Sequence, residues 1–279
     1  MAVLIKTSKK FLFLALVLLT GIVMVLADFL VLLFFEHSFS HILPRFGIPA
    51  LAFVIVYTVV LGRRARCFEA AFFQDVSQEV FLNRLKEIGS VPIKMIALNV
   101  VLHFLFLGGV FFRGEYLGID PAVKTPLFLA ALSFGMLVGT FIYVMSDGLV
   151  SQTLISYNLN VYPRNLREKR QELKAFIIPL AVALMTILFT GAITAISGTA
   201  TERGASVMLV PLIIFFFCVA GLAFCLKKNA NVIYTSVVAQ LENLSSEHKD
   251  LTRRISVCSV DEMGTIAGMV NTFCEYLGG

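Results

Sequence analysis

The chain has 279 residues, of which 58% are hydrophobic and 15% are charged, and its mean hydropathy is +0.87. Ordinary soluble domains carry about 25% charged residues, so this composition excludes a soluble globular protein and indicates an integral membrane protein. The net charge of +5 does not indicate nucleic-acid binding, because the basic residues lie beside apolar segments, where they report membrane topology.

Six apolar stretches are long enough to cross a bilayer as helices, which takes about 20 residues. They lie at residues 11–35, 46–62, 92–112, 126–146, 175–196 and 206–226. We therefore predict an all-α membrane protein in which residues 1–226 form a six-span bundle. As an alternative, the first stretch could be a signal peptide cleaved near Ala27, but its apolar run continues past Asp28 to Phe35 and is longer than such peptides require.

Basic residues are distributed unequally between the two sides of this bundle. An even number of spans places both termini on one side, and eighteen of the 23 Lys and Arg residues lie there. Arg45, Arg113, Lys124 and Arg203 lie on the opposite side, and Lys94 lies near a membrane boundary. Because basic residues accumulate in cytoplasmic loops, we predict a multi-pass inner (cytoplasmic) membrane protein with both termini in the cytoplasm.

The inner connecting segments are longer than the outer ones. Phe72, Val76 and Val80 recur every four residues between Arg66 and Ile88, which predicts an amphipathic helix that continues the second span or lies on the inner leaflet. In the second inner loop, the charged sequence of residues 165–174 predicts a helix. The outer segments are too short for a sensor domain, so we expect the input to be read by the bundle, by these loops or by a partner protein.

Two groups of polar residues lie in or beside the spans, where burial in lipid is costly. Asp28 lies late in the first span and Arg45 opens the second at the same membrane face. They form either a structural ion pair or part of an outward-facing ligand site. Asn99 and His103 are four residues apart and therefore share one face of the third span. They serve either hydrogen bonding between helices or the sensing of a ligand or proton.

Small residues recur at a spacing of four in the fourth span, at Ala131, Gly135 and Gly139. This pattern permits close approach of helices, either within one bundle or between two chains.

Signatures of catalysis are absent from the sequence. It contains no P-loop, no H-E-x-x-H, no nucleophile elbow and no kinase phospho-acceptor motif. The five cysteines form no C-x-x-C pair and are expected to be reduced. Glu36, His37 and His41 could form a metal or pH-sensing group, although such a group is more often ordinary polar surface. We predict no catalytic residue, no metal and no cofactor within residues 1–279.

After Leu226 the chain becomes polar and carries two heptad patterns, each typical of a coiled-coil seam. The first consists of Ala230, Tyr234, Val237, Leu241 and Leu244, and the second of Met263, Ile266, Val270, Phe273 and Leu277. Between them lie the apolar residues Leu251 and Ile255, followed by Asp261, Glu262 and Gly264. Negative charge at the start of the second segment favours a helix N-terminus there.

Residues 227–279 resemble the HAMP linker, a helix–connector–helix coiled coil that relays signals from a membrane domain to a cytoplasmic output domain. The resemblance implies a parallel homodimer in which Leu251 and Ile255 pack onto the bundle and Gly264 permits close approach. Two departures are Lys249, where the family usually has glycine, and the absence of the proline common near the start of the first helix. We therefore divide the chain into a sensor bundle, 1–226, and a HAMP-like relay, 227–279.

A six-span bundle with a HAMP-like linker resembles a methyl-accepting chemotaxis receptor whose output domain is absent from residues 1–279. The alternative is the membrane anchor and HAMP region of a class III adenylate cyclase, and a sensor kinase input module is a further one. A transporter would need an internal repeat and broken helices at its midplane; the sequence contains no inverted repeat, and a transporter has no need of a heptad stalk. We expect a homodimeric transducer in the lipid bilayer with cytoplasmic signalling partners and no nucleic acid.

Overall fold

The computed structural model is helical throughout its described part, with no strand in the ranges that follow. The described residues are 2–36, 39–74, 77–112, 121–157, 178–199, 205–245, 256 and 262–278. The α-helices are α1 (Ala2–Glu36), α2 (Phe39–Gly62), α3 (Gln78–Gly89), α4 (Val91–Phe112), α5 (Pro121–Tyr157), α7 (Ile178–Thr199), α8 (Ala205–Ser245) and α9 (Glu262–Gly278). Two short 3-10 helices, η1 (Arg63–Phe68) and η2 (Ala70–Phe73), follow α2.

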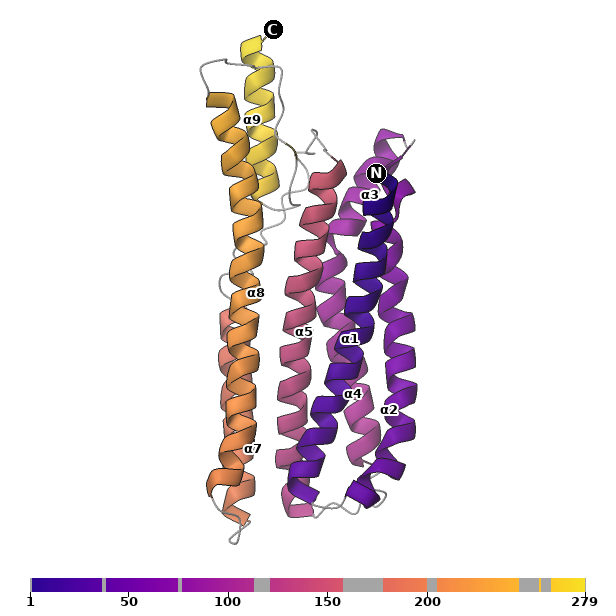
Figure 1. Ribbon diagram of the computed structural model, residues 1–279, viewed down its shortest axis with the longest axis vertical. Helices are drawn as coiled ribbons and strands as arrows, with labels where there is room; N and C mark the ends of the chain where they lie inside the picture. The colour runs from indigo at the N-terminus through magenta and orange to yellow at the C-terminus, as the bar shows by residue number, and fades with distance from the viewer. Residues whose placement is uncertain are drawn as a thin grey trace.

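Six helices of the described part are long and apolar enough to cross a membrane. Their apolar spans are Lys9–Leu33, Phe46–Phe68, Val91–Phe111, Lys124–Tyr157, Ile178–Ala195 and Val210–Asn231. Each overlaps one of the six stretches predicted from the sequence, so the prediction of an all-α chain with six helices able to cross a membrane is confirmed for the described residues. Both ends of the chain lie at the same end of the bundle (Figure 1), as an even number of spans requires.

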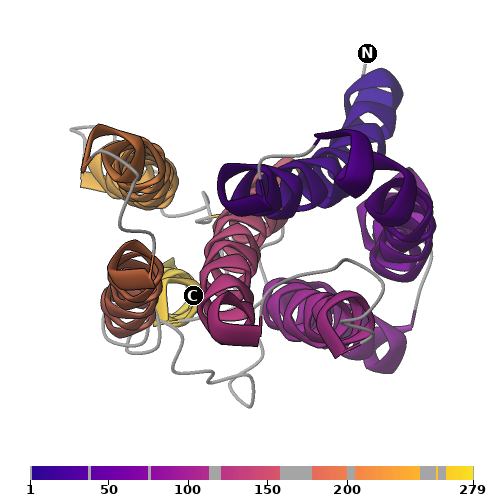
Figure 2. The same ribbon diagram turned by 90° about the horizontal axis from the view of Figure 1, so that it is seen from below.

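Helix α5 is the centre of the bundle, and it packs against α1, α4, α7 and α8 (Figure 2). Inside the protein, 72% of its apolar span is buried, against 17% for that of α8. Small side chains explain this position, because Ala130, Ala131 and Ser133 are fully buried and let neighbouring helices approach. Helices α1, α2, α4 and α5 therefore form a four-helix group, with α7 and α8 on its flank.

The flanking pair is attached to α5 through three phenylalanine rings. Phe134 of α5 lies with its ring centroid 5.1 Å from Phe189 of α7 and 5.4 Å from Phe215 of α8. The Phe189 and Phe215 rings stack at 4.4 Å. We call these residues the aromatic triad; it gives α8 a compact contact with the bundle, while most of α8 faces outward.

The segment between α2 and α4 differs from its prediction. Instead of one amphipathic helix over Arg66–Ile88, the chain forms η1 and η2 and then α3, which begins after Ser77 in extended backbone. Val80, predicted on the packing face, is 41% exposed. The segment folds back instead, because Phe68 stacks on Phe13 at 4.7 Å and its burial outweighs continuation of the helix.

Helix α8 continues past the membrane span without a break. It is 41 residues long, which at 1.5 Å per residue is about 60 Å, and its last turns project beyond the bundle beside α9 (Figure 1). The predicted boundary at residues 226 and 227 thus falls inside a continuous helix. The connector residues Leu251 and Ile255 lie outside the described residues, as does Asp261.

Candidate functional site: a buried polar cluster and the relay helix

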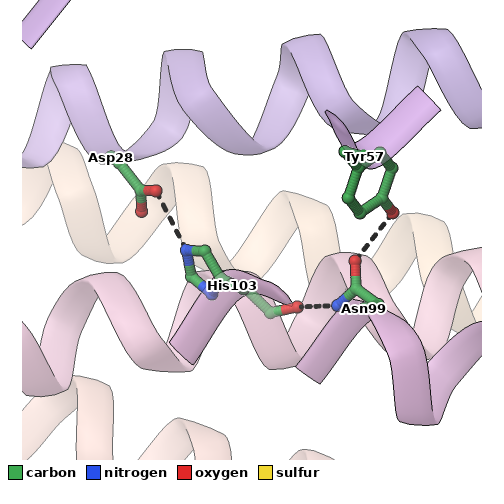
Figure 3. A network of polar contacts seen from close by, with 5 residues as sticks. Asp28, Tyr57, Asn99 and His103 are labelled. Carbon is green, nitrogen blue, oxygen red and sulfur yellow. Dashed lines mark hydrogen bonds and ion pairs between the residues drawn. The ribbon is translucent and has the colours of Figure 1, made fainter. Parts of the chain in front are cut away.

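Four polar residues from three helices meet inside the four-helix group, and we call them the polar cluster: Asp28 of α1, Tyr57 of α2, and Asn99 and His103 of α4 (Figure 3). Each side chain is at most 1% exposed. Asn99 and His103 face the same way from α4, as their spacing predicts. Because polar groups at this depth have no water to bond, each must find a partner within the protein.

Asp28 and His103 form the ionisable part of the polar cluster. The His103 Nε2 atom lies 2.9 Å from the Asp28 Oδ2 atom. The second carboxylate oxygen, Oδ1, is buried and has no hydrogen-bond partner among the described residues. The sequence suggested Arg45 as the partner of Asp28, but the described partner is His103, and the Arg45 side chain lies outside the described part. A buried charge is costly unless paired, so this contact holds α1 to α4.

Asn99 connects helices α2 and α5 to α4. The Tyr57 hydroxyl donates to the Asn99 Oδ1 atom at 2.7 Å, and the Asn99 Nδ2 group donates to the Gly135 carbonyl of α5 at 3.0 Å (Figure 3). Asn99 thereby links α2, α4 and α5. Sequence analysis missed Tyr57, although a tyrosine within an apolar span signals a hydroxyl that needs a partner.

Two glycines of α5 make room for the polar cluster. A Cβ atom at Gly135 would lie 1.7 Å from the His103 Nδ1 atom, and one at Gly139 would lie 2.6 Å from the Asn99 Nδ2 atom. The small-residue pattern of the fourth span therefore serves packing between α4 and α5 within one chain. From the sequence alone, this pattern could have served packing either within one bundle or between two chains.

A second polar contact fastens α8 to α5 near the end of the α8 span. The Asn229 Nδ2 group lies 3.2 Å from both the Val144 carbonyl and the Asp147 Oδ2 atom. A Cβ atom at Gly148 would lie 2.8 Å from the Asn229 Oδ1 atom, so the glycine permits this contact. We call it the Asn229 contact. Sequence analysis did not single out either Asn229 or Asp147.

The polar cluster and α8 meet the same stretch of α5. Gly135 receives the hydrogen bond from Asn99, and its neighbour Phe134 contacts Phe215 of α8 as part of the aromatic triad. Successive residues of a helix point about 100° apart, so α5 presents the polar cluster on one face and the triad on another. A shift of α5 at this level would reach α8 directly.

The residues predicted to form the HAMP relay are only partly described. Leu241 is 37%, Ile266 41% and Phe273 62% exposed, and Val237 and Leu244 lie on α8 with side chains outside the described part. Glu262 begins α9, and Gly264 is buried.

Helix α9 buries a different stripe from the predicted seam, since Ala267, Asn271 and Cys274 are at most 4% exposed. In one chain the heptad residues Ile266 and Phe273 therefore face outward. Within residues 262–278, the predicted seam is therefore not the buried face of α9 in a single chain.

Comparison with known proteins adds no relative: the chain matches no family model, no curated protein and no solved structure. Among the described residues, no group of three or more His, Cys, Asp or Glu side chains is placed to hold a metal ion. What the polar cluster and α8 do is therefore inferred from their own geometry.

Proposed function

We propose that this protein is a membrane signal-transduction relay, in which rearrangement of the helix bundle moves α8 and thereby changes a cytoplasmic output. The single observation that carries the proposal is the unbroken course of α8 from the far end of the bundle to Ser245. A continuous helix transmits rotation or translation along its length, whereas a hinge at the membrane boundary would dissipate it.

The packing of α8 supports the same proposal. Only 17% of its span is buried, and its described attachments to α5 include the ring contact of Phe215 and the hydrogen bonds of Asn229. The four-helix group is instead tied together by the polar cluster. A helix that buries little of its surface has a smaller free-energy difference between alternative positions, as a relay requires.

We further propose that two chains pair in parallel through residues 227–279 in the manner of a HAMP linker. Exposed apolar residues on α8 and α9, among them Tyr234, Leu241, Ile266 and Phe273, supply the surface that a second copy would cover. The connector sequence from Asp250 favours a chemotaxis receptor as the output class, with an adenylate cyclase as the alternative. The relay lies in the cytoplasm in this scheme, together with both termini.

Disulfide cross-linking tests this dimer. With the five native cysteines replaced, Val237→Cys and Phe273→Cys should each cross-link to its twin in membranes under mild oxidation. Glu242→Cys, next to Leu241 on the exposed side of α8, should cross-link several-fold less. Equal yields at all three positions would contradict the proposed seam.

A further inference from the structure

A cavity of about 610 Å³ lies between the four-helix group and the flanking pair. Its walls come from α1, α5, α7 and α8, and include Leu26, Phe141, Phe189, Gly221 and Phe224. This volume falls within the range of about 300–1,000 Å³ that is usual for ligand pockets. The cavity therefore separates α8 from α1 at the level of the membrane spans.

The walls of the cavity offer almost nothing polar. Apart from the thiols of Cys218 and Cys225, the polar side chain on the lining is Thr20. The Thr20 hydroxyl already donates to the Leu16 and Val17 carbonyls of its own helix, at 2.9 Å each. An occupant would gain no strong hydrogen bond here, so the cavity selects hydrocarbon.

The rim of the cavity faces the surrounding membrane. Leu26 and Leu30 of α1 are 53% and 44% exposed, and Ile214 and Phe224 of α8 are 39% and 67% exposed. All four lie within apolar spans, where the protein surface meets lipid chains rather than water. The opening therefore admits a molecule from the bilayer.

The size of the cavity decides between a lipid chain and a protein helix. A transmembrane helix about 10 Å wide and about 27 Å long occupies roughly 2,000 Å³, whereas the whole space between the walls, its open side included, is about 1,650 Å³. A helix from a second copy of this chain therefore does not fit inside. A single flexible hydrocarbon chain needs far less room and adapts to an irregular wall.

We infer that this cavity binds one acyl chain of a membrane phospholipid, wedged between α1 and α8. The chain would fill the space that Gly221 leaves, because a Cβ atom at Gly221 meets nothing within 4 Å. Its consequence for signalling rests on the proposed relay: occupancy holds α8 away from α1, and the acyl chain becomes a component that sets the position of α8.

Tryptophan fluorescence provides a direct test, because the chain contains no tryptophan. Phe141→Trp places the only indole on the α5 wall of the cavity, and Phe216→Trp places it on the lipid-facing side of α8, where Phe216 is 67% exposed. Full-length protein would be reconstituted into phosphatidylcholine vesicles with or without bromine atoms on the acyl chains. Bromine quenches an indole that it contacts, so both variants should lose at least half of their fluorescence.

Filling the cavity distinguishes a bound chain from general contact with lipid. Gly221→Leu narrows the cavity from the α8 side, so adding it should restore part of the fluorescence of Phe141→Trp and leave that of Phe216→Trp quenched. Gly191→Leu is the matched control, since a Cβ atom there also meets nothing within 4 Å but Gly191 does not line the cavity; it should restore neither signal. Val23→Phe, which fills the cavity from α1, is the second variant should Gly221→Leu fail to fold.

Three results would overturn the inference. Absence of quenching in Phe141→Trp would mean that no acyl chain enters. Quenching that survives both filling substitutions would mean that the indole touches bulk lipid. Quenching by a brominated free fatty acid but not by a brominated phospholipid would mean that the occupant is a fatty acid and not a phospholipid chain. Occupancy is measured here without any signalling output or dimer, so these failures are separate from failure of the cross-linking test.

Discussion

At the scale of single residues, the polar cluster depends on glycines of α5, which leave room for the side chains of α4. In Gly135→Ala, the new methyl group would fall 1.7 Å from the His103 Nδ1 atom, so the imidazole must move away from Asp28. We expect a loss of about 1–3 kcal/mol in the free energy of unfolding, typical of an overpacked core. Unfolding in detergent mixtures, followed by circular dichroism, would measure it.

The control for this substitution is Gly191→Ala on α7. A Cβ atom there meets nothing within 4 Å, and alanine favours a helix over glycine by about 1 kcal/mol. Stability should therefore be unchanged or slightly raised. If Gly135→Ala were equally harmless, the close packing of α4 on α5 would be refuted.

The Asp28–His103 contact makes a second prediction at this scale. His103→Leu leaves the Asp28 carboxylate buried without its partner, and removal of one member of a buried pair costs about 3–5 kcal/mol. In the double variant with Asp28→Leu, no charge remains to be compensated. The loss in free energy of unfolding should therefore be smaller in the double variant than the sum of the losses in the two single variants, by at least about 1 kcal/mol. Strict additivity in a double-mutant cycle would show that the contact contributes no coupling.

At the scale of elements, α8 is attached to α5 by the ring contact of Phe215 and by the Asn229 contact, among other packing; the Asn229 contact is nearer the relay than Phe215. Asn229→Ala removes both of its hydrogen bonds, each with a net value of about 0.5–1.5 kcal/mol. A change of about 1.4 kcal/mol alters the ratio of two states tenfold. With the chain fused to a measurable output domain, we expect the basal output to shift several-fold toward one extreme.

Asn231→Ala is the comparison for that variant. Asn231 lies two residues further along α8 with its side chain exposed, so its loss should leave the basal output within the range of the parent protein. An identical response from both variants would mean that the contact with Asp147 does not restrain α8.

The spans were predictable because their length and apolar character are properties of contiguous sequence. The shared face of Asn99 and His103 was predictable for a similar reason, since spacing within one helix fixes direction. The partners of Asp28 and Asn229 were not, because His103 and Asp147 are brought close only by the packing of separate helices. The helix over Arg66–Ile88 was predicted wrongly because apolar spacing does not reveal that Phe68 folds back onto Phe13.

At the scale of the whole molecule, both ends of the chain lie at one end of the bundle (Figure 1). The distribution of basic residues predicts that this end is cytoplasmic. Reporter fusions after Gly198 and after Gly279 should therefore report opposite compartments, the first outside and the second in the cytoplasm. The same compartment for both would refute the six-span topology in the membrane.

The length of α8 has a mechanical consequence. Phe215 and Ser245 are 30 residues apart on one rigid helix, which corresponds to about 45 Å. If the contact at Phe215 acts as a fulcrum, a tilt of about 5° displaces the tip sideways by roughly 4 Å. The same tilt moves Asn229, 14 residues from Phe215, by roughly 2 Å, which is enough to break its hydrogen bonds at 3.2 Å. The helix therefore acts as a lever arm that the Asn229 contact restrains.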